Sequence, residues 1–322
     1  MKNIKWGILG LGKIAGKFAT ALKDVEGAEL YAVASRSKTK AETFAKEHAA
    51  TKLFSSYQAM LKDEELDVVY IATPHVFHYE QTLLCLDHKK AVLCEKPFAM
   101  NKKQVEEMIA KAKKEKVFLM EAMWTQFLPH FKFVIEQIKS EKYGKIKNLK
   151  ADFGFPAPVD LDKRLYNKNL GGGSLLDIGI YPIFMAMSAL GAPERIQAKA
   201  SFHDTGVDEN CDIIFEYKNG VEAELGSSII KQTPTAAIIQ FEKATLTLKT
   251  RFHEPTIIII QTPEGEETKE FKVNSNGYNF EAEHVQKMLR EGKTESTEMT
   301  FEKSLQLIEL LDKVRTKIGL EY

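Results

Sequence analysis

The chain has 322 residues, 44% of them hydrophobic, and its 45 basic residues balance 45 acidic ones. This length suits about two domains, and a formal net charge of zero offers no field to recruit nucleic acid or an anionic membrane. We expect no membrane span and no secretory leader, because no apolar stretch is long enough and the first residues run directly into a strand. The three cysteines, Cys85, Cys94 and Cys211, favour a reduced, cytoplasmic chain over a disulfide framework.

The amino-terminal half alternates apolar strands with helices. After the first strand, a helical stripe of apolar residues begins at Ile14 and ends at Val25. Strands are predicted at 4–9, 29–34, 67–72, 91–94 and 117–120, and further helices at 39–47, 78–86 and 102–114. This alternation predicts an α/β fold with a doubly wound parallel sheet of the Rossmann type, which we place at residues 1–122.

A glycine-rich turn, Gly10-Leu11-Gly12-Lys13-Ile14-Ala15, joins the first strand to that helix. Gly10 permits the tight turn, Gly12 lets a pyrophosphate approach the backbone, and Ala15 lets the helix pack closely on the strand. The phosphate then meets the free N–H groups at the helix start. The sequence therefore predicts that Gly10, Leu11, Gly12, Lys13 and Ile14 bind a dinucleotide.

The residues after the second strand indicate which dinucleotide is bound. An NAD site usually carries an acid there for the ribose 2′-OH, whereas this chain has Ser35-Arg36-Ser37, with Lys40 one turn further on. The planar fork of Arg36 suits a 2′-phosphate, which Ser35 can also contact. Solvated surface charges are the plainer interpretation of Arg36 and Lys40. We expect NADP, with NAD still possible.

The segment Thr73-Pro74-His75-Val76-Phe77-His78 forms a turn after the third predicted Rossmann strand, 67–72. We expect Thr73, Pro74 and His75 to line the cofactor site. His78 lies at the start of the next helix, where it contacts the cofactor or instead packs or caps. The His-x-x-His spacing does not indicate a metal, because no further ligand stands nearby at ligand spacing.

The tripeptide Glu95-Lys96-Pro97 stands at the carboxyl end of the apolar strand 91–94. Ligands bind at that end of an open parallel sheet, so Lys96 is expected to face a cleft. A positive charge held there can polarise a hydroxyl or a carbonyl for hydride transfer. Most lysines are solvated surface groups, so the tripeptide alone is weak evidence.

The carboxyl-terminal half, residues 123–322, is predicted as a substrate and dimerisation domain with a large, mostly antiparallel sheet. Strands are predicted at 146–153, 210–217, 221–227, 236–241, 244–249, 255–262 and 267–273, and helices at 128–139 and 301–318. The run Ile257-Ile258-Ile259-Ile260 is apolar on both faces, and an uncovered strand of that kind would aggregate. We therefore expect helices on one face and a second copy of the chain on the other, in a homodimer.

One segment of this half does not look purely structural. Gly171-Gly172-Gly173 opens a helix on which Asp177 and Tyr181 stand four residues apart, on one face. A carboxylate and a phenol are costly to bury without partners. Either Tyr181 packs while Asp177 caps or pairs, or both point into a cleft toward Lys96. In the second case Tyr181 exchanges a proton with the substrate, its pKa lowered by the lysine.

These motifs together resemble the glucose–fructose oxidoreductase, inositol dehydrogenase and rhizopine-catabolism family (Gfo/Idh/MocA), over nearly the whole chain. The motif Glu121-Ala122-Met123-Trp124 adds to the resemblance, which is strongest with the branch of dihydrodiol and NADP-dependent xylose dehydrogenases. The resemblance implies a Rossmann domain and an open-faced sheet that dimerises.

The resemblance also implies roles for single residues. Lys96 corresponds to the catalytic lysine and Tyr181 to its acid/base partner. Asp177 matches the family's acid by motif, and it would orient the substrate or hold the lysine. Glu95 and Trp124 would lie at the cofactor, Trp124 or Arg164 at the substrate, and the Lys96–Pro97 bond would be cis. A surface position for Arg164 is equally plausible, and Gln126 stands where relatives often carry arginine.

Two functions of different classes fit these motifs. The first is an NADP-dependent dehydrogenase that moves hydride between the nicotinamide and a hydroxyl or carbonyl of a sugar, polyol or dihydrodiol. The second is a regulatory protein that senses NAD(P) on the same fold and does no chemistry. The retained Lys96 and Tyr181 favour the enzyme. An enzyme that keeps its cofactor bound and couples two sugars is a third, less favoured reading.

Overall fold

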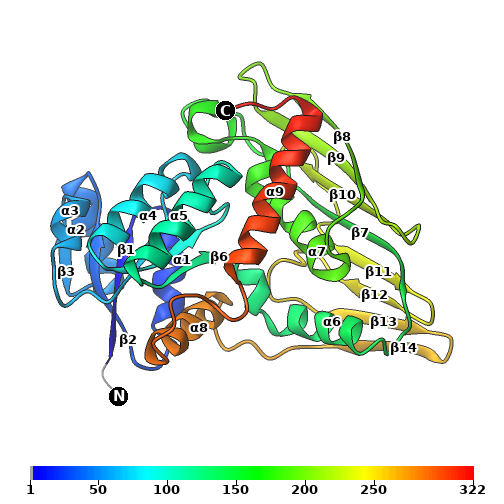
Figure 1. Ribbon diagram of the computed structural model, residues 1–322, viewed down its shortest axis with the longest axis horizontal. Coiled ribbons are helices and arrows are strands. Elements are labelled where there is room, and N and C mark those ends of the chain that lie inside the picture. Colours follow the sequence, from blue (N-terminus) through cyan, green and yellow to red (C-terminus); the bar gives the residue numbers. More distant parts are fainter. Residues whose placement is uncertain (1–2) are drawn as a thin grey trace. The chain divides into compact units, whose positions relative to one another are not determined.

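The computed structural model describes residues 3–322, which form two compact units (Figure 1). Unit 1 holds the chain up to Phe127 together with Val273–Leu305, and unit 2 holds Leu128–Lys272 with Gln306–Tyr322. The single boundary expected after residue 122 is thus corrected, because the chain returns to unit 1 near its end. The returning helix is fixed there by ring stacking: Tyr278 lies parallel to Trp124 with 4.1 Å between ring centroids.

Unit 1 is built on a six-stranded parallel sheet with the order β3-β2-β1-β4-β5-β6, as expected for a Rossmann fold. Its strands are β1 (Ile4–Leu9), β2 (Ala28–Ala34), β3 (Lys52–Phe54), β4 (Val68–Ile71), β5 (Ala91–Glu95) and β6 (Leu119–Ala122). Its helices are α1 (Lys13–Leu22), α2 (Lys38–His48), α3 (Tyr57–Leu61), α4 (His78–Asp87), α5 (Lys102–Glu115) and α8 (Tyr278–Arg290). The sequence did not predict β3, α3 or α8.

The strand order reverses at β1, which pairs with both β2 and β4. Ligands bind beyond the carboxyl ends of strands at such a switch point. The turn after β1 requires glycine at position 10, where φ is +88° and a Cβ would stand 2.5 Å from Thr73 Cγ2. The backbone itself therefore brings the turn after β1 against the turn after β4.

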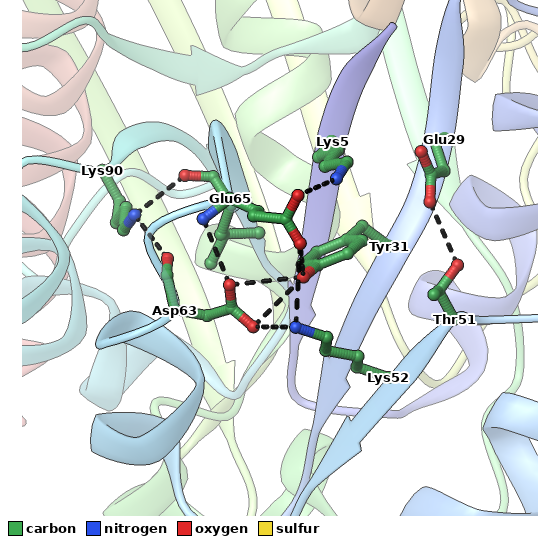
Figure 2. A network of polar contacts seen from close by, with 9 residues as sticks. Lys5, Glu29, Tyr31, Thr51, Lys52, Asp63, Glu65 and Lys90 are labelled. Atoms are coloured by element: carbon green, nitrogen blue, oxygen red, sulfur yellow. Dashed lines mark hydrogen bonds and ion pairs between the residues drawn. The ribbon is translucent and has the colours of Figure 1, made fainter.

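A polar network centred on Tyr31 joins neighbouring strands of the same sheet (Figure 2). The Tyr31 hydroxyl donates to Glu65 at 2.8 Å and to Asp63 at 3.2 Å. Lys5 pairs with Glu65 and Lys52 with Asp63, each at 2.8 Å, and both ammonium groups lie within 5 Å of the Tyr31 ring centroid. These cations and the phenol lower the pKa of both carboxyls. The network links β1, β2 and β3 to the loop before β4.

Unit 2 is built on an eight-stranded sheet with the order β14-β13-β12-β11-β7-β10-β9-β8. Its strands are β7 (Ile146–Gly154), β8 (Arg195–Phe202), β9 (Asp208–Glu216), β10 (Glu222–Ser228), β11 (Ala237–Phe241), β12 (Thr245–Leu248), β13 (Ile258–Thr262) and β14 (Gly265–Lys269). Its helices include α6 (Pro129–Lys139), α7 (Ile180–Leu190) and the greater part of α9 (Phe301–Ile318). Every pairing is antiparallel except that of β7 with β10, so the predicted class of sheet is confirmed.

Helix α7 covers one face of this sheet, against β7 and β10 (Figure 1). The stretch Lys168–Leu190 is long and apolar enough to cross a membrane, contrary to the expectation that no such stretch exists. Its apolar window is 83% buried within the protein, as in the core helix of a globular domain. Its length and apolar content thus reflect a position in the core of unit 2.

The other face of the sheet is open in the chain by itself. Lys150 and Glu224 form an ion pair across it at 2.8 Å, beside a hollow of about 820 Å³. In the isoleucine run, Ile258 and Ile260 are buried, whereas Ile257 and Ile259 stay partly exposed. Of the two predicted covers of the sheet, the chain itself supplies the helices on one face.

Candidate active site

The glycine turn of unit 1 opens into a pocket of about 320 Å³. It is lined by Gly10, Leu11, Gly12, Ser35, Arg36, Lys40, Tyr57, Ala72, Thr73, Pro74, Phe77 and Gln81. A Cβ at Gly12 would meet nothing within 4 Å, so the space beside the start of α1 is open. The first turn of α1 has no acidic residue, which leaves its N–H groups available to an anion.

Positive charge gathers at one part of this pocket. Arg36 and Lys40 line it, and none of its lining residues in the described chain is Asp or Glu. The Arg36 guanidinium lies 5.9 Å from the centroid of the Phe77 ring, which holds the fork over an apolar surface. Burial raises the pKa of Tyr57, and nearby Arg36 acts in the opposite direction. The pocket thus combines a phosphate-binding turn with a cation site.

The structure brings most of the predicted cofactor residues together, with some exceptions. Lys13 and Ile14 form the first turn of α1 and do not line the pocket. The sequence analysis missed Tyr57, because the short α3 shows no clear periodicity, and also Phe77 and Gln81. Gln81 could not be assigned from sequence, since its contact, a 2.7 Å hydrogen bond from Thr73, crosses from a turn to a helix.

Of the two alternatives for His78, the structure matches packing rather than cofactor contact. Its ring nitrogens lie 2.9 Å from the Thr73 carbonyl oxygen and 2.8 Å from the Pro97 carbonyl oxygen. It therefore joins the turn after β4 to the loop after β5 and does not line the pocket, and neither does buried His75. Within residues 3–322 no cluster of His, Cys, Asp or Glu is arranged to hold a metal ion.

Lys96 directly follows β5, and the Lys96–Pro97 peptide bond is cis, as the resemblance implied. Glu95, assigned to the cofactor, is buried and accepts a hydrogen bond from the Tyr70 hydroxyl; its other oxygen accepts from the Lys96 N–H at 3.2 Å. These contacts give Glu95 a structural position within unit 1. Together with the His78–Pro97 contact, they fix the backbone that carries the lysine.

A second carboxylate holds the same loop. Glu121 in β6 is buried and accepts from the Phe98 N–H at 3.1 Å. Burial raises its pKa to about 7, although hydrogen bonds from Ser304 and Phe98 oppose the shift. The motif that supported the family resemblance therefore contributes a support for the Lys96 loop.

The last residue of that motif, Trp124, is buried against Tyr278 of α8. Its assignment to the cofactor or the substrate stays a prediction. Gln126, which stands where relatives often carry arginine, accepts a hydrogen bond from Lys303 at 3.1 Å.

Unit 2 brings Asp177, Arg164 and Tyr181 into a second group. Arg164 and Asp177 form an ion pair at 2.8 Å, and their side chains are 31% and 12% exposed, so the pair is accessible from one side. Tyr181 in α7 is buried, with its ring 4.6 Å from that of His253. Asp177 pairs and Tyr181 packs, as in the first of the two alternatives predicted from the sequence. The exposed edge of the Arg164–Asp177 pair is also compatible with the second alternative, in which these side chains face a cleft.

Asp177 lies in a π-helical turn, Leu175–Gly179, rather than in the regular helix that was predicted. Such turns are uncommon and occur frequently at functional sites. The sequence analysis also missed Asp208, whose buried carboxylate accepts hydrogen bonds from Ser174 and from the Leu175 N–H. No local pattern could reveal that contact, since Asp208 stands 34 residues from Ser174.

Comparison with known proteins agrees with this geometry. Residues 4–123 match the model described as "Oxidoreductase family, NAD-binding Rossmann fold", and residues 131–247 match the "GFO/IDH/MocA C-terminal domain". The chain is 37% identical to a trans-1,2-dihydrobenzene-1,2-diol dehydrogenase of Xenopus laevis, over 99% of each chain. It is 36% identical to the scyllo-inositol 2-dehydrogenase (NADP(+)) of Bacillus subtilis, over 99% of this chain and 98% of the other.

Among solved structures, the fold is similar to that of a 3-ketoreductase from Actinomadura kijaniata in complex with NADP and TDP-benzene. That similarity has a TM-score of 0.90, at 26% identity over 98% of both chains. The chain belongs to the Gfo/Idh/MocA family of oxidoreductases, and it is an NAD(P)-dependent dehydrogenase acting on CH–OH groups.

Proposed function

We propose that the protein uses NADP(H) and moves hydride between the nicotinamide and a hydroxyl or carbonyl carbon of a small sugar, polyol or dihydrodiol. The observation that carries the cofactor choice is the wall of the 320 Å³ pocket, which holds Arg36 and Lys40 and, among its lining residues, no carboxylate. A carboxylate there would accept from a ribose 2′-OH and repel a 2′-phosphate. A guanidinium fork instead binds phosphate oxygens with two parallel hydrogen bonds.

Lys96 and Tyr181 are the proton-handling groups in this proposal. Bound NADP⁺ would serve as the hydride acceptor in oxidation, so the chain's own residues must take up the hydroxyl proton. Tyr181, in its phenolate form, would accept that proton, and the ammonium of Lys96 would stabilise the negative charge that develops on the oxygen. The Arg164–Asp177 pair orients the substrate, because its exposed edge offers both a donor and an acceptor to neighbouring hydroxyls.

The substrate class rests on the relatives. Proteins named for a dihydrodiol and for scyllo-inositol match this chain over nearly its full length. Both named substrates carry a secondary alcohol on a six-membered ring. We therefore propose a small cyclic polyol or dihydrodiol ahead of an open-chain alcohol, with cyclic aldoses tested beside them.

We also propose that the protein is a homodimer through the open face of its eight-stranded sheet. The partly exposed Ile257 and Ile259, and exposed Ile214 on β9, support this proposal. A sedimentation experiment tests it: a species of 36.4 kDa at micromolar concentration would contradict the dimer. A cytoplasmic location stays a proposal, supported by three cysteines that are all buried, free thiols.

The cofactor proposal is tested by steady-state kinetics with NADP⁺ and NAD⁺ on a panel of cyclic polyols, aldoses and trans-dihydrodiols. Arg36→Ala should raise the KM for NADP⁺ by about 10- to 100-fold, the size expected for one charge-assisted contact, and leave NAD⁺ kinetics nearly unchanged. Lys38→Ala is the matched control, because Lys38 lies two residues after Arg36 at the start of α2, exposed and outside the pocket. Equal effects on the two cofactors would contradict a 2′-phosphate contact. Tight NADPH binding with no turnover on any substrate would instead favour the sensing function.

A further inference from the structure

The buried carboxylate of Asp208 accepts hydrogen bonds from the turn that precedes Asp177 and Tyr181. It is the first residue of β9 and has no exposed surface. Its Oδ2 accepts from the Ser174 hydroxyl at 2.7 Å and from the Leu175 N–H at 2.7 Å. The Ser174 hydroxyl also lies 2.9 Å from that of Ser227 in β10. Two strands of the sheet thus hold a single turn.

The turn is shaped to admit this carboxylate. Gly173 has a φ of +111°, and a Cβ there would stand 2.1 Å from Asp208 Oδ1. A side chain at Gly173 is therefore excluded both by its backbone conformation and by the aspartate. The Gly173 N–H donates to the Leu165 carbonyl at 2.8 Å, which fixes the other side of the turn. The third glycine of the Gly171-Gly172-Gly173 motif is thus explained by its approach to Asp208.

A charged carboxylate in this position lowers the free energy of unfolding. Burial raises the pKa of Asp208 to about 6, even though hydrogen bonds from Ser174 and Leu175 favour the charged form. Its second oxygen, Oδ1, has no hydrogen-bond partner among residues 3–322. Its charge contributes to the raised pKa of Tyr322 and of Cys211, and neither of these groups is a cation. An apolar or amide side chain would avoid this cost, so a contribution to function would explain why a carboxylate stands here.

The position of the carboxylate suggests that contribution. Leu175, whose N–H it accepts, is the first residue of the π-helical turn Leu175–Gly179, and α7 follows directly with Tyr181. A π turn takes more residues per turn than an α turn, so an anchor at its first N–H decides how the following side chains are directed. Asp177 lies two residues beyond this anchor and Tyr181 six.

We propose that Asp208 is a positioning residue, which fixes the register of the π-helical turn and thereby the direction in which Asp177 and Tyr181 meet the substrate. This inference rests on the proposed roles of Asp177 and Tyr181. The rival explanation, a helix anchor that serves folding alone, predicts a loss of stability without a selective loss of turnover. The two explanations are separated by measuring structure, cofactor binding and turnover on the same variants.

The variants are Asp208→Ala, which removes both acceptors, and Asp208→Asn, which keeps the shape and one oxygen. Asp204→Asn is the matched control, because Asp204 is exposed in the turn just before β9 and lies outside the hollow of the open sheet face. Asp208→Ala should lower kcat at least about tenfold, since displacements near 1 Å can cost about a hundredfold. The Kd for NADPH, which binds in unit 1, should stay within about twofold in the same variant. Asp208→Asn should recover a measurable part of the lost kcat.

Hydrogen exchange provides a readout that does not depend on knowing the substrate. Amides in the peptide spanning 174–181 should exchange faster in Asp208→Ala and at the wild-type rate in Asp204→Asn. A folded Asp208→Ala protein with unchanged kcat overturns the inference, whether or not its exchange is faster. If Asp208→Ala does not fold, the same measurements on Asp208→Asn decide. A wild-type protein that is inactive on every substrate counts against the proposed function, while the exchange result still decides the anchoring by Asp208.

Discussion

The buried Asp208 predicts an unusual stability profile for Asp208→Asn. The pKa of Asp208 is raised from 3.8 to about 6, so the folded protein holds this proton more tightly than the unfolded chain does. A carboxyl whose pKa is raised by folding does not change the free energy of unfolding when the pH is below its pKa in the unfolded chain. It lowers that free energy by the full amount when the pH is above its pKa in the folded protein. The asparagine variant has no such penalty. Its stability relative to the wild type should therefore rise with pH.

The magnitude follows from the size of the shift. At 1.36 kcal/mol for each pKa unit, a rise from 3.8 to about 6 corresponds to about 3 kcal/mol of unfolding free energy. By proton linkage, roughly 2.5 kcal/mol of this difference in unfolding free energy develops between pH 4 and pH 8, most of it below pH 6.5. Since asparagine does not titrate, weaker hydrogen bonds from Ser174 and Leu175 lower the stability of the variant equally at every pH. The pH-dependent part is thus separable from any loss of bonding.

Urea unfolding of both proteins between pH 4 and pH 8 is the assay, with the free energy difference plotted against pH. Asp204→Asn controls for the loss of one charge and should give a much flatter difference, because Asp204 is exposed. A difference between wild type and Asp208→Asn that does not change with pH would refute the reasoning. It would show that the folded carboxyl titrates as it does in the unfolded chain, and that its burial carries no cost.

Two further predictions concern unit 1. Glu121→Gln should gain stability relative to the wild type as pH rises from 4.5 toward 7, by about 3 kcal/mol in full, because burial raises the pKa of Glu121 from 4.5 to about 7. Urea unfolding of unit 1 checks this, and a loss of turnover in the same variant would show that the Phe98 contact supports the Lys96 loop. Gly10→Ala should destabilise the protein by at least about 1 kcal/mol and weaken NADPH binding, since φ is +88° and the new Cβ would stand 2.5 Å from Thr73 Cγ2. An alanine variant with unchanged melting temperature and unchanged NADPH affinity would contradict it.

Much of the fold could be predicted because its signals are local. Strand β1 is a short apolar run, and α1 after it repeats apolar residues at helical spacing. The cofactor pocket follows from the same signals, since the turns after β1, β2 and β4 meet wherever such a sheet forms. Arg36 and Thr73 could be assigned to one site for this reason, although they stand far apart in the chain.

Other features depend on contacts between distant segments, and no local pattern carries them. Helix α8 belongs to unit 1 because Tyr278 stacks on Trp124, a contact across more than a hundred residues. The π-helical turn Leu175–Gly179 is buried throughout, so its apolar residues show no period that differs from a helix. The pairing of Arg164 with Asp177 was foreseen only as one of two alternatives, because sequence spacing does not fix which partner a carboxylate meets.

The two units share one arrangement around their proposed catalytic residues. In unit 1, Glu121 accepts the N–H of Phe98, two residues beyond Lys96. In unit 2, Asp208 accepts the N–H of Leu175, six residues before Tyr181. Burial raises the pKa of each carboxyl toward neutrality, so both are ionised only at the cost of folding stability. Because each acts within its own unit, their effects on stability should add, whereas their effects on turnover should not, since the proposed reaction uses both Lys96 and Tyr181.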